Sequence, residues 1–108
     1  MSTRHNYVTQ NTTDYHKSLI QSLHDKEEAI AYLEVALEEY ENDGDNQAFM
    51  LALKNVVEAQ GGIGCLSRKT GLDRAHLYRV LSSKGNPRFL TLGNILKALG
   101  FKLSISAV

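Results

Sequence analysis

Residues 63–87 decide the fold, and their sequence is IGCLSRKTGLDRAHLYRVLSSKGNP. This stretch predicts two short helices, at about 63–69 and 74–83, separated by a short turn. The second helix follows Asp73, whose side-chain oxygen can accept a hydrogen bond from an amide of the first turn. Gly71 gives the turn a residue that tolerates a positive φ.

The two helices have what a helix-turn-helix requires, which is a steep crossing held together by apolar contacts. Ser67 is a small residue at the point where the helices approach each other. The apolar anchors are Leu66, Leu72, Leu77 and Val80. The stretch therefore predicts a helix-turn-helix whose second helix enters the major groove of DNA.

The outer arc of the second helix carries the candidate DNA contacts. Arg74 and Arg79 can each bind the O6 and N7 atoms of guanine, and Ala75 can contact a thymine methyl group, so these three are the predicted base-reading residues. The predicted phosphate contacts are Gly64, through its backbone amide, and Tyr78, Ser82, Lys84, Asn86 and Arg88. The alternative that each is an ordinary surface residue stays open.

The net charge of the chain is zero, from 12 basic and 12 acidic residues, but the charges are divided between two halves. Residues 1–47 hold three Lys and Arg against ten Asp and Glu, a net charge of −7. Residues 48–108 hold nine against two, a net charge of +7. The basic half suits the phosphates of DNA, whereas the acidic half suits a cationic partner.

The N-terminal half divides into an arm and a helical region. Residues 1–13 are polar without periodicity, and they predict a flexible arm. Residues 14–43 form an acidic region, with a short helix over 15–23 and a longer helix that Asp25 caps. The predicted apolar face of the longer helix consists of Ala29, Ile30, Leu33, Ala36, Leu37 and Tyr40.

Residues 44–108 make up the predicted DNA-binding domain, which begins with a helix over about 46–60. Thr91 is predicted to cap a further helix that ends at Gly100. Apolar and polar residues then alternate over 101–107, as in a half-buried strand. Because no other strand is predicted, we expect this one to pair with its copy in a homodimer, although packing on its own domain or a frayed end is an alternative. The predicted dimer strand comprises Leu103, Ser104, Ile105 and Ser106.

The composition excludes several other classes of protein. The single cysteine, Cys65, cannot form an internal disulfide, and no apolar run approaches the roughly 20 residues of a membrane span. The polar N-terminus lacks the apolar middle of a signal peptide. The four histidines have no metal-ligand spacing, and no oriented His–carboxylate pair accompanies Cys65. We expect a mostly helical, compact cytoplasmic protein without enzymatic activity, cofactor, metal site or membrane contact.

Residues 44–105 resemble helix-turn-helix domains of the Cro/lambda-repressor type, in the pattern LSRKTGLD and LYRVL followed by GNP and TLGNILKALG. From about Tyr15 to Ile105 the chain is similar to the HigA-type antitoxins, which are addiction-module antidote proteins. The matching segments include SLHDKEEA, AYLEVALEE, AFMLALKNVVEAQGG and KALGFKLSI. Ser67 departs from the pattern, because Ala is commoner there.

The resemblance implies an antitoxin that binds and neutralises a small basic toxin of the RelE/ParE-like, HigB type. It also implies a homodimer that represses its own operon by binding operator DNA. Carried over, it assigns base reading to Arg74, Ala75 and Arg79 and the dimer strand to residues 103–106. Two alternatives remain open: a stand-alone, phage-type transcriptional regulator, and a protein-interaction module that does not bind DNA.

Overall fold

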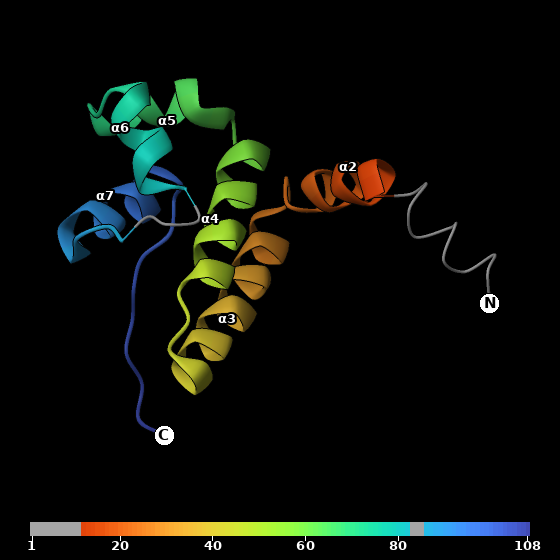
Figure 1. Ribbon diagram of the computed structural model, residues 1–108, viewed down its shortest axis with the longest axis vertical. Coiled ribbons are helices and arrows are strands. Elements are labelled where there is room, and N and C mark those ends of the chain that lie inside the picture. Colours follow the sequence, from red (N-terminus) through yellow and green to blue (C-terminus); the bar gives the residue numbers. More distant parts are fainter. Residues whose placement is uncertain (1–11, 83–85) are drawn as a thin grey trace.

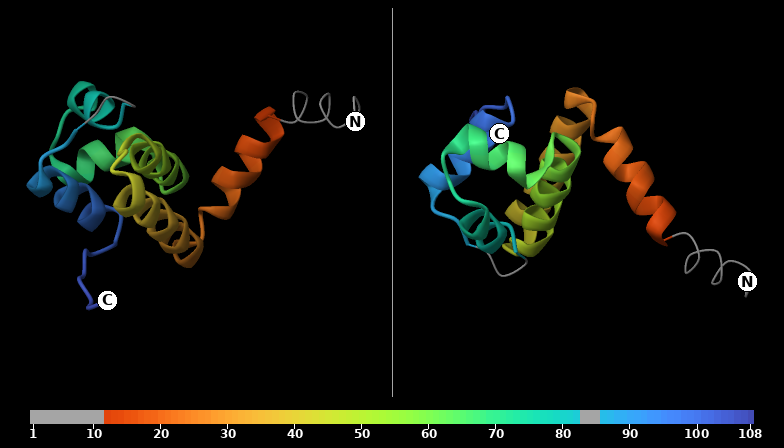
Figure 2. Two further views of the ribbon diagram at one scale, coloured as in Figure 1. Left: turned by 60° about the horizontal axis from the view of Figure 1, so that its bottom comes forward. Right: turned by 90° about the horizontal axis from the view of Figure 1, so that it is seen from above.

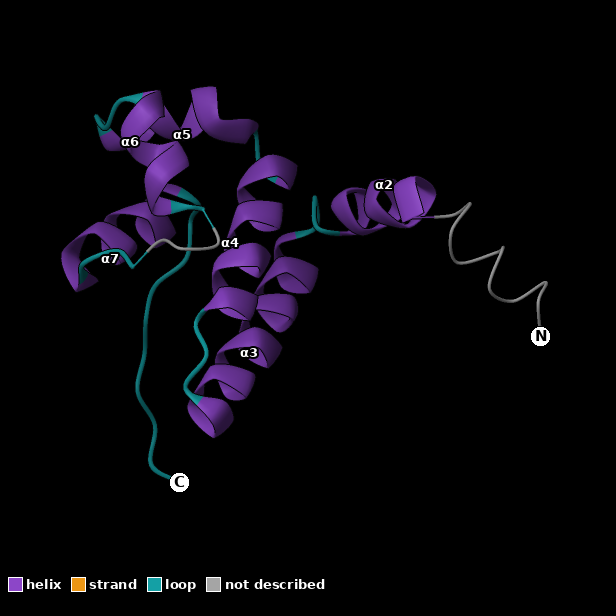
Figure 3. Cartoon of the chain, viewed as in Figure 1, coloured by secondary structure: helices purple, strands orange, loops and turns teal. Residues whose placement is uncertain are grey.

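The computed structural model describes residues 12–82 and 86–108, and its regular structure is helical. Within these residues there are six helices and no strand (Figure 3). The helices are α2 (Thr12–Ser22), α3 (Lys26–Asp43), α4 (Gln47–Ala59), α5 (Gly62–Thr70), α6 (Arg74–Val80) and α7 (Phe89–Ala98). The prediction of a mostly helical fold is confirmed. Across the described ranges, no helix is long and apolar enough to cross a lipid bilayer.

The helices are arranged around a hairpin of α3 and α4, which lie side by side and antiparallel (Figure 1). On one side of this hairpin α5, α6 and α7 pack together. On the other side α2 projects away from the body, as the two further views show (Figure 2). The predicted arm, residues 1–13, lies outside the described residues except for its last two, which begin α2.

The ends of α3 follow from its capping residues. The Asp25 side chain accepts a hydrogen bond of 3.0 Å from the amide of Glu27, so the predicted N-cap is confirmed. At the other end Gly44 has a φ of +74° and donates its N–H to the carbonyl of Tyr40. A glycine adopts this left-handed conformation at little cost, so the chain can leave α3 and turn directly into α4.

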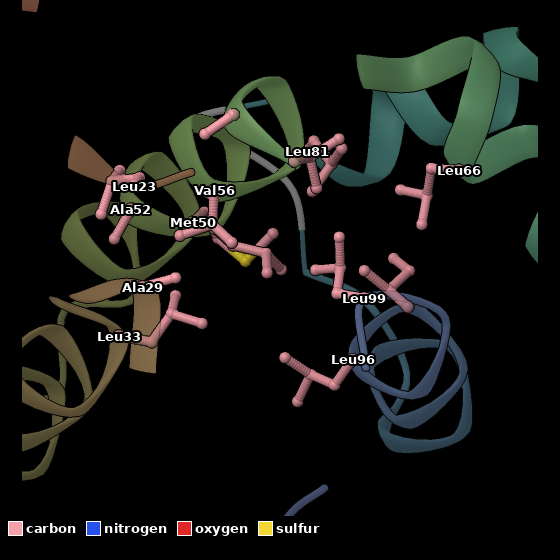
Figure 4. Close-up of a cluster of buried hydrophobic side chains, with 14 of the residues drawn as sticks. Leu23, Ala29, Leu33, Met50, Ala52, Val56, Leu66, Leu81, Leu96 and Leu99 are labelled. Carbon is pink, nitrogen blue, oxygen red and sulfur yellow. The ribbon is translucent and has the colours of Figure 1, made fainter. Parts of the chain in front are cut away.

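The core lies where the α3–α4 hairpin meets the other helices. Leu33 of α3, Val56 of α4 and Leu96 of α7 extend into the same space (Figure 4). The largest fully buried side chains are Leu23, Met50, Leu53, Leu66, Leu77, Ile95, Val56 and Val57. Since they come from both the acidic and the basic half of the sequence, the two halves share one core.

Helix α2 is held to the body by its C-terminal end. Leu23, just after the helix, is buried, and Gln60 Nε2 donates hydrogen bonds to the carbonyls of Leu23 (2.7 Å) and His24 (3.0 Å). Further along α2, His16 Nε2 lies 3.3 Å from Glu58 Oε2 of α4. The junction of α2 and α3 is therefore fixed against the end of α4.

A lysine joins the start of α3 to the end of α7. Lys26 Nζ donates a hydrogen bond of 2.6 Å to the carbonyl of Leu99, and it lies 5.3 Å from the ring centroid of Phe101. The positive charge meets the negative end of the helix dipole and the π face of an aromatic ring. Gly100, with a φ of +89°, ends the helical region as predicted.

Two predicted helix boundaries were wrong. Helix α6 ends at Val80 rather than 83, because Leu81 departs from helical geometry and Ser82 donates to the carbonyl of Arg79, three residues back. Helix α7 begins at Phe89, after an extended Arg88, so Thr91 lies within its first turn and is not the cap.

The C-terminal strand is also absent from the single chain. Residues 101–108 have no regular secondary structure, so Leu103, Ser104, Ile105 and Ser106 are not part of a sheet. The physical reason is that alternation of polar and apolar residues does not make a strand by itself. A strand also needs a neighbouring strand for its backbone hydrogen bonds, and the described parts of the chain provide none.

Candidate functional site

The turn between α5 and α6 is fixed by hydrogen bonds from small side chains. Gly71 ends α5 with a φ of +77°, which confirms its predicted role. Ser67 Oγ donates a hydrogen bond of 2.6 Å to the carbonyl of Leu72, and Thr70 Oγ1 accepts one of 3.2 Å from the amide of Leu72. The backbone of the turn is therefore satisfied within the α5–turn–α6 unit.

Helix α6 has one buried and one exposed side. The Asp73 carboxylate accepts a hydrogen bond of 2.7 Å from the amide of His76, which confirms the predicted N-cap. Leu77 is fully buried, and Leu81 just beyond the helix is nearly so. The opposite side is exposed and consists of Arg74, Ala75, Tyr78, Arg79 and Ser82, as the periodicity predicts. This arc gathers five of the predicted DNA contacts on one surface.

A basic cluster forms where this surface meets the start of α5. A Cβ atom on Gly64 would lie 2.9 Å from Arg74 Nη2 and 3.9 Å from Arg68 Nη1. The guanidinium groups of Arg74 and Arg68 therefore both approach the backbone of Gly64. The first-turn amides of a helix have no intrahelical acceptor, so three sources of positive potential converge here. The cluster brings together two predicted contacts, Gly64 and Arg74.

Sequence reasoning did not identify Arg68 as part of this cluster. The available signal was its position four residues after Gly64, which places the two on the same side of α5. Of the remaining predicted phosphate contacts, Asn86 and Arg88 are exposed in the segment before α7. Lys84 lies outside the described residues.

A second surface feature is a groove, and Asn86, one of the predicted phosphate contacts, is among the residues that line it. This groove of about 720 Å³ lies between α3, the start of α4, α7 and the segment that follows α7. Its lining includes Ile30, Glu34, Leu37, Tyr40, Leu96 and Leu103. Ile30, Leu37 and Tyr40 were predicted to belong to the apolar face of α3, yet they are 42%, 39% and 42% exposed. Only Ala29, Leu33 and Ala36 of that face are buried, because α4 covers only part of it.

Neither surface has the groups that a metal would need. In the described ranges, 12–82 and 86–108, no three His, Cys, Asp or Glu side chains come together as metal ligands. Cys65 is a free, half-buried thiol on α5. Both surfaces offer charge, hydrogen-bonding groups and apolar contacts.

Comparison with known proteins gives the chain a family. Residues 13–107 match the family described as "probable addiction module antidote protein". An uncharacterized protein of Haemophilus influenzae is 28% identical over 98 residues, covering 91% of this chain and 94% of the relative. No solved structure matches the chain significantly. Because the family match extends over nearly the whole length, the chain belongs to the family of probable addiction module antidote proteins.

Proposed function

We propose that the chain is the antitoxin of a type II toxin–antitoxin module, acting in the cytoplasm. It neutralises a small basic toxin of the RelE/ParE-like, HigB type by binding it directly. It also represses its own operon by sequence-specific binding to operator DNA. The observation that carries the proposal is membership of the antidote family, since an antidote requires a toxin as its partner.

The acidic half of the chain supports binding of a basic toxin. Helix α3 alone carries seven acidic residues, Glu27, Glu28, Glu34, Glu38, Glu39, Glu41 and Asp43, and all of them are exposed. Charge complementarity speeds the encounter of two proteins and suppresses wrong partners. A basic toxin suits this surface, whereas DNA would be repelled by it.

The unit of α5, the turn at Gly71–Asp73 and α6 supports DNA binding. We propose that it is a helix-turn-helix of the Cro/lambda-repressor type, with α6 as the recognition helix. Ala75 and Arg79 would read bases, whereas Arg74, whose guanidinium lies beside Gly64, would meet a phosphate together with Arg68 and the first-turn amides of α5. The exposed arc on α6 and the net charge of +7 over residues 48–108 support this assignment.

A homodimer through residues 103–106 completes the proposal. Ile105 is fully exposed and Leu103 is 45% exposed, so the segment presents apolar side chains to water. Antiparallel pairing with the same segment of a second copy would cover them and would satisfy the backbone. The pairing would also relate two recognition helices by a two-fold axis, as operator half-sites about 34 Å apart require.

The toxin part of the proposal is tested by a growth assay. The product of the reading frame beside the gene for this chain is expressed from an inducible promoter, with and without the chain. Growth arrest that the chain relieves supports the antitoxin. Arrest that persists, while the chain still binds its promoter, contradicts the antitoxin and favours the stand-alone regulator.

The DNA part is tested by titrating the promoter with the purified chain at increasing salt. We expect the affinity to fall steeply between about 50 and 200 mM salt, because Lys and Arg release counterions when they neutralise phosphates. Arg79→Ala should reduce the discrimination between operator and scrambled DNA while the fold stays intact. A chain that relieves growth arrest without binding its promoter would instead be a protein-interaction module.

A further inference from the structure

The groove beside α3 has a chemistry that selects its occupant. Its floor is apolar, with Leu33, Met50 and Leu96. Ile30, Leu37 and Tyr40 remain partly exposed along the wall that α3 forms. Pockets that bind small molecules have volumes of roughly 300–1,000 Å³, and apolar grooves also bind the apolar face of an amphipathic helix.

One rim of the groove is strongly acidic. Glu34 lines the groove, and Glu27 and Glu41 lie seven residues before and after it, on the same side of α3. Glu38 follows Glu34 by one turn. All four carboxylates are exposed, and in the described ranges none has a basic side chain within ion-pair distance. We call these four residues the acidic strip. Lys102, on the opposite wall, is the basic residue of the lining.

We propose that this groove is the docking surface for a cationic amphipathic segment of the partner toxin. Apolar side chains of the segment fill the groove, and its Lys or Arg side chains lie along the acidic strip. The inference rests on the proposed antitoxin function, and it restricts the contact to one side of α3 rather than to the acidic half as a whole. Helix-in-groove binding with charged flanks is a common mode of peptide recognition.

A second copy of the chain is a poorer occupant of the apolar floor of the groove, although Leu103 and Ser104 of the proposed dimer segment line one of its walls. In a two-fold contact the same surface is used on both copies. If two copies met through the groove, the acidic strip of each copy would lie at their interface. The like charges of the two strips would then oppose association. The charge of the rim therefore favours a cationic partner.

Matched variants on α3 separate the groove from the general charge of the helix. Glu34→Lys alters the acidic strip, and Glu39→Lys makes the same change on the other side of the helix. Leu37→Ser removes an apolar groove contact, and Val35→Ser makes a comparable change at an exposed residue outside the groove. All four side chains are exposed, so the variants are expected to fold, and their thermal unfolding is measured alongside.

The first probe is a fluorescently labelled, amphipathic helical peptide of leucine and lysine, and its binding is followed by anisotropy. We expect wild type, Glu39→Lys and Val35→Ser to bind it with similar affinity. Glu34→Lys and Leu37→Ser should each weaken binding about tenfold, because a repulsive charge or a lost apolar contact costs at least about 1.4 kcal/mol. If all four variants bind the peptide with the affinity of the wild type, the groove is not the docking surface, and the proposal is wrong.

The second readout is relief of growth arrest by the same four variants, with the product of the neighbouring reading frame as the toxin. The proposal is supported if Glu34→Lys and Leu37→Ser fail to relieve growth arrest while the two control variants relieve it. Full relief by all four variants overturns the groove and leaves the antitoxin function standing. No relief by the wild type overturns the antitoxin function itself. If Glu34→Lys or Leu37→Ser instead converts a dimer to a monomer in sedimentation, the groove joins two copies, and the inference is wrong.

Discussion

Lys26 Nζ and the carbonyl oxygen of Leu99 are joined by a hydrogen bond of 2.6 Å, across 73 positions of sequence. The contact ties the first turn of α3 to the C-terminal end of α7. The same ammonium group faces the ring of Phe101. One side chain of the acidic half thus holds the start of the C-terminal segment that forms a wall of the groove.

Lys26→Met should lower the free energy of unfolding by about 1 kcal/mol, because the Leu99 carbonyl loses a charged donor and the helix dipole loses a cation. Methionine keeps the apolar stem, so packing changes little. Urea denaturation measures the effect. Lys54→Met, at an exposed residue of α4, is the control and should change stability by less than about 0.5 kcal/mol. Equal effects of the two substitutions would show that the Lys26 contact contributes nothing.

Ser67→Ala should destabilise the fold by about 1 kcal/mol, although the resemblance to helix-turn-helix domains implies that Ala is acceptable at this position of the first helix. The reason is the hydrogen bond of 2.6 Å from Ser67 Oγ to the Leu72 carbonyl, which would lose its donor. Ser18→Ala, on the exposed face of α2, provides the comparison for the same chemical change. If Ser67→Ala unfolds at the same urea concentration as wild type, water replaces the hydroxyl without cost.

Gly71→Ala and Gly93→Ala should change stability in opposite directions. Neither glycine has a heavy atom within 4 Å of the position that a Cβ would occupy, so steric clash is absent in both. Gly71 has a φ of +77°, where alanine costs about 1–2 kcal/mol. Gly93 lies inside α7, where alanine stabilises a helix by up to about 1 kcal/mol. Thermal unfolding of both variants checks the signs, and a stabilised Gly71→Ala would contradict the role of the turn.

Gly64→Ala should weaken promoter binding while leaving stability almost unchanged. The new methyl group would meet the flexible end of Arg74 and displace its guanidinium from the start of α5. The phosphate would then lose part of its positive cluster, so we expect an affinity reduced about tenfold and a smaller salt dependence. Fluorescence anisotropy on promoter DNA measures both. If Gly64→Ala unfolds like the wild type and also binds promoter DNA with the same affinity, the cluster is not part of the DNA-binding surface.

The sequence predicted correctly those helix ends and turn features that depend on neighbouring residues. Asp25 and Asp73 were predicted as N-caps, and both accept the expected backbone hydrogen bond. Gly71 was predicted to need a positive φ, and it has one. These features depend on residues only a few positions apart, so spacing alone is enough to predict them.

Features that depend on distant segments could not be predicted in the same way. The periodicity of α3 places Leu33 and Leu37 on one apolar face, but only the packing of α4 and α7 decides that Leu33 is buried and Leu37 is not. The groove was missed for that reason. The contact of Lys26 with Leu99 joins residues whose proximity no local pattern indicates. The strand predicted over 101–107 needs a partner strand, and residues 12–82 and 86–108 of one chain provide none.

Direct binding of toxin is the central claim, and sedimentation of purified components tests it most directly. The chain and the product of the neighbouring reading frame are mixed, and both sedimentation and toxin activity are followed as the chain is added. We predict a single species that contains both proteins, with toxin activity falling in proportion to the chain bound. Two proteins that sediment separately, with the toxin fully active in excess chain, would contradict the account.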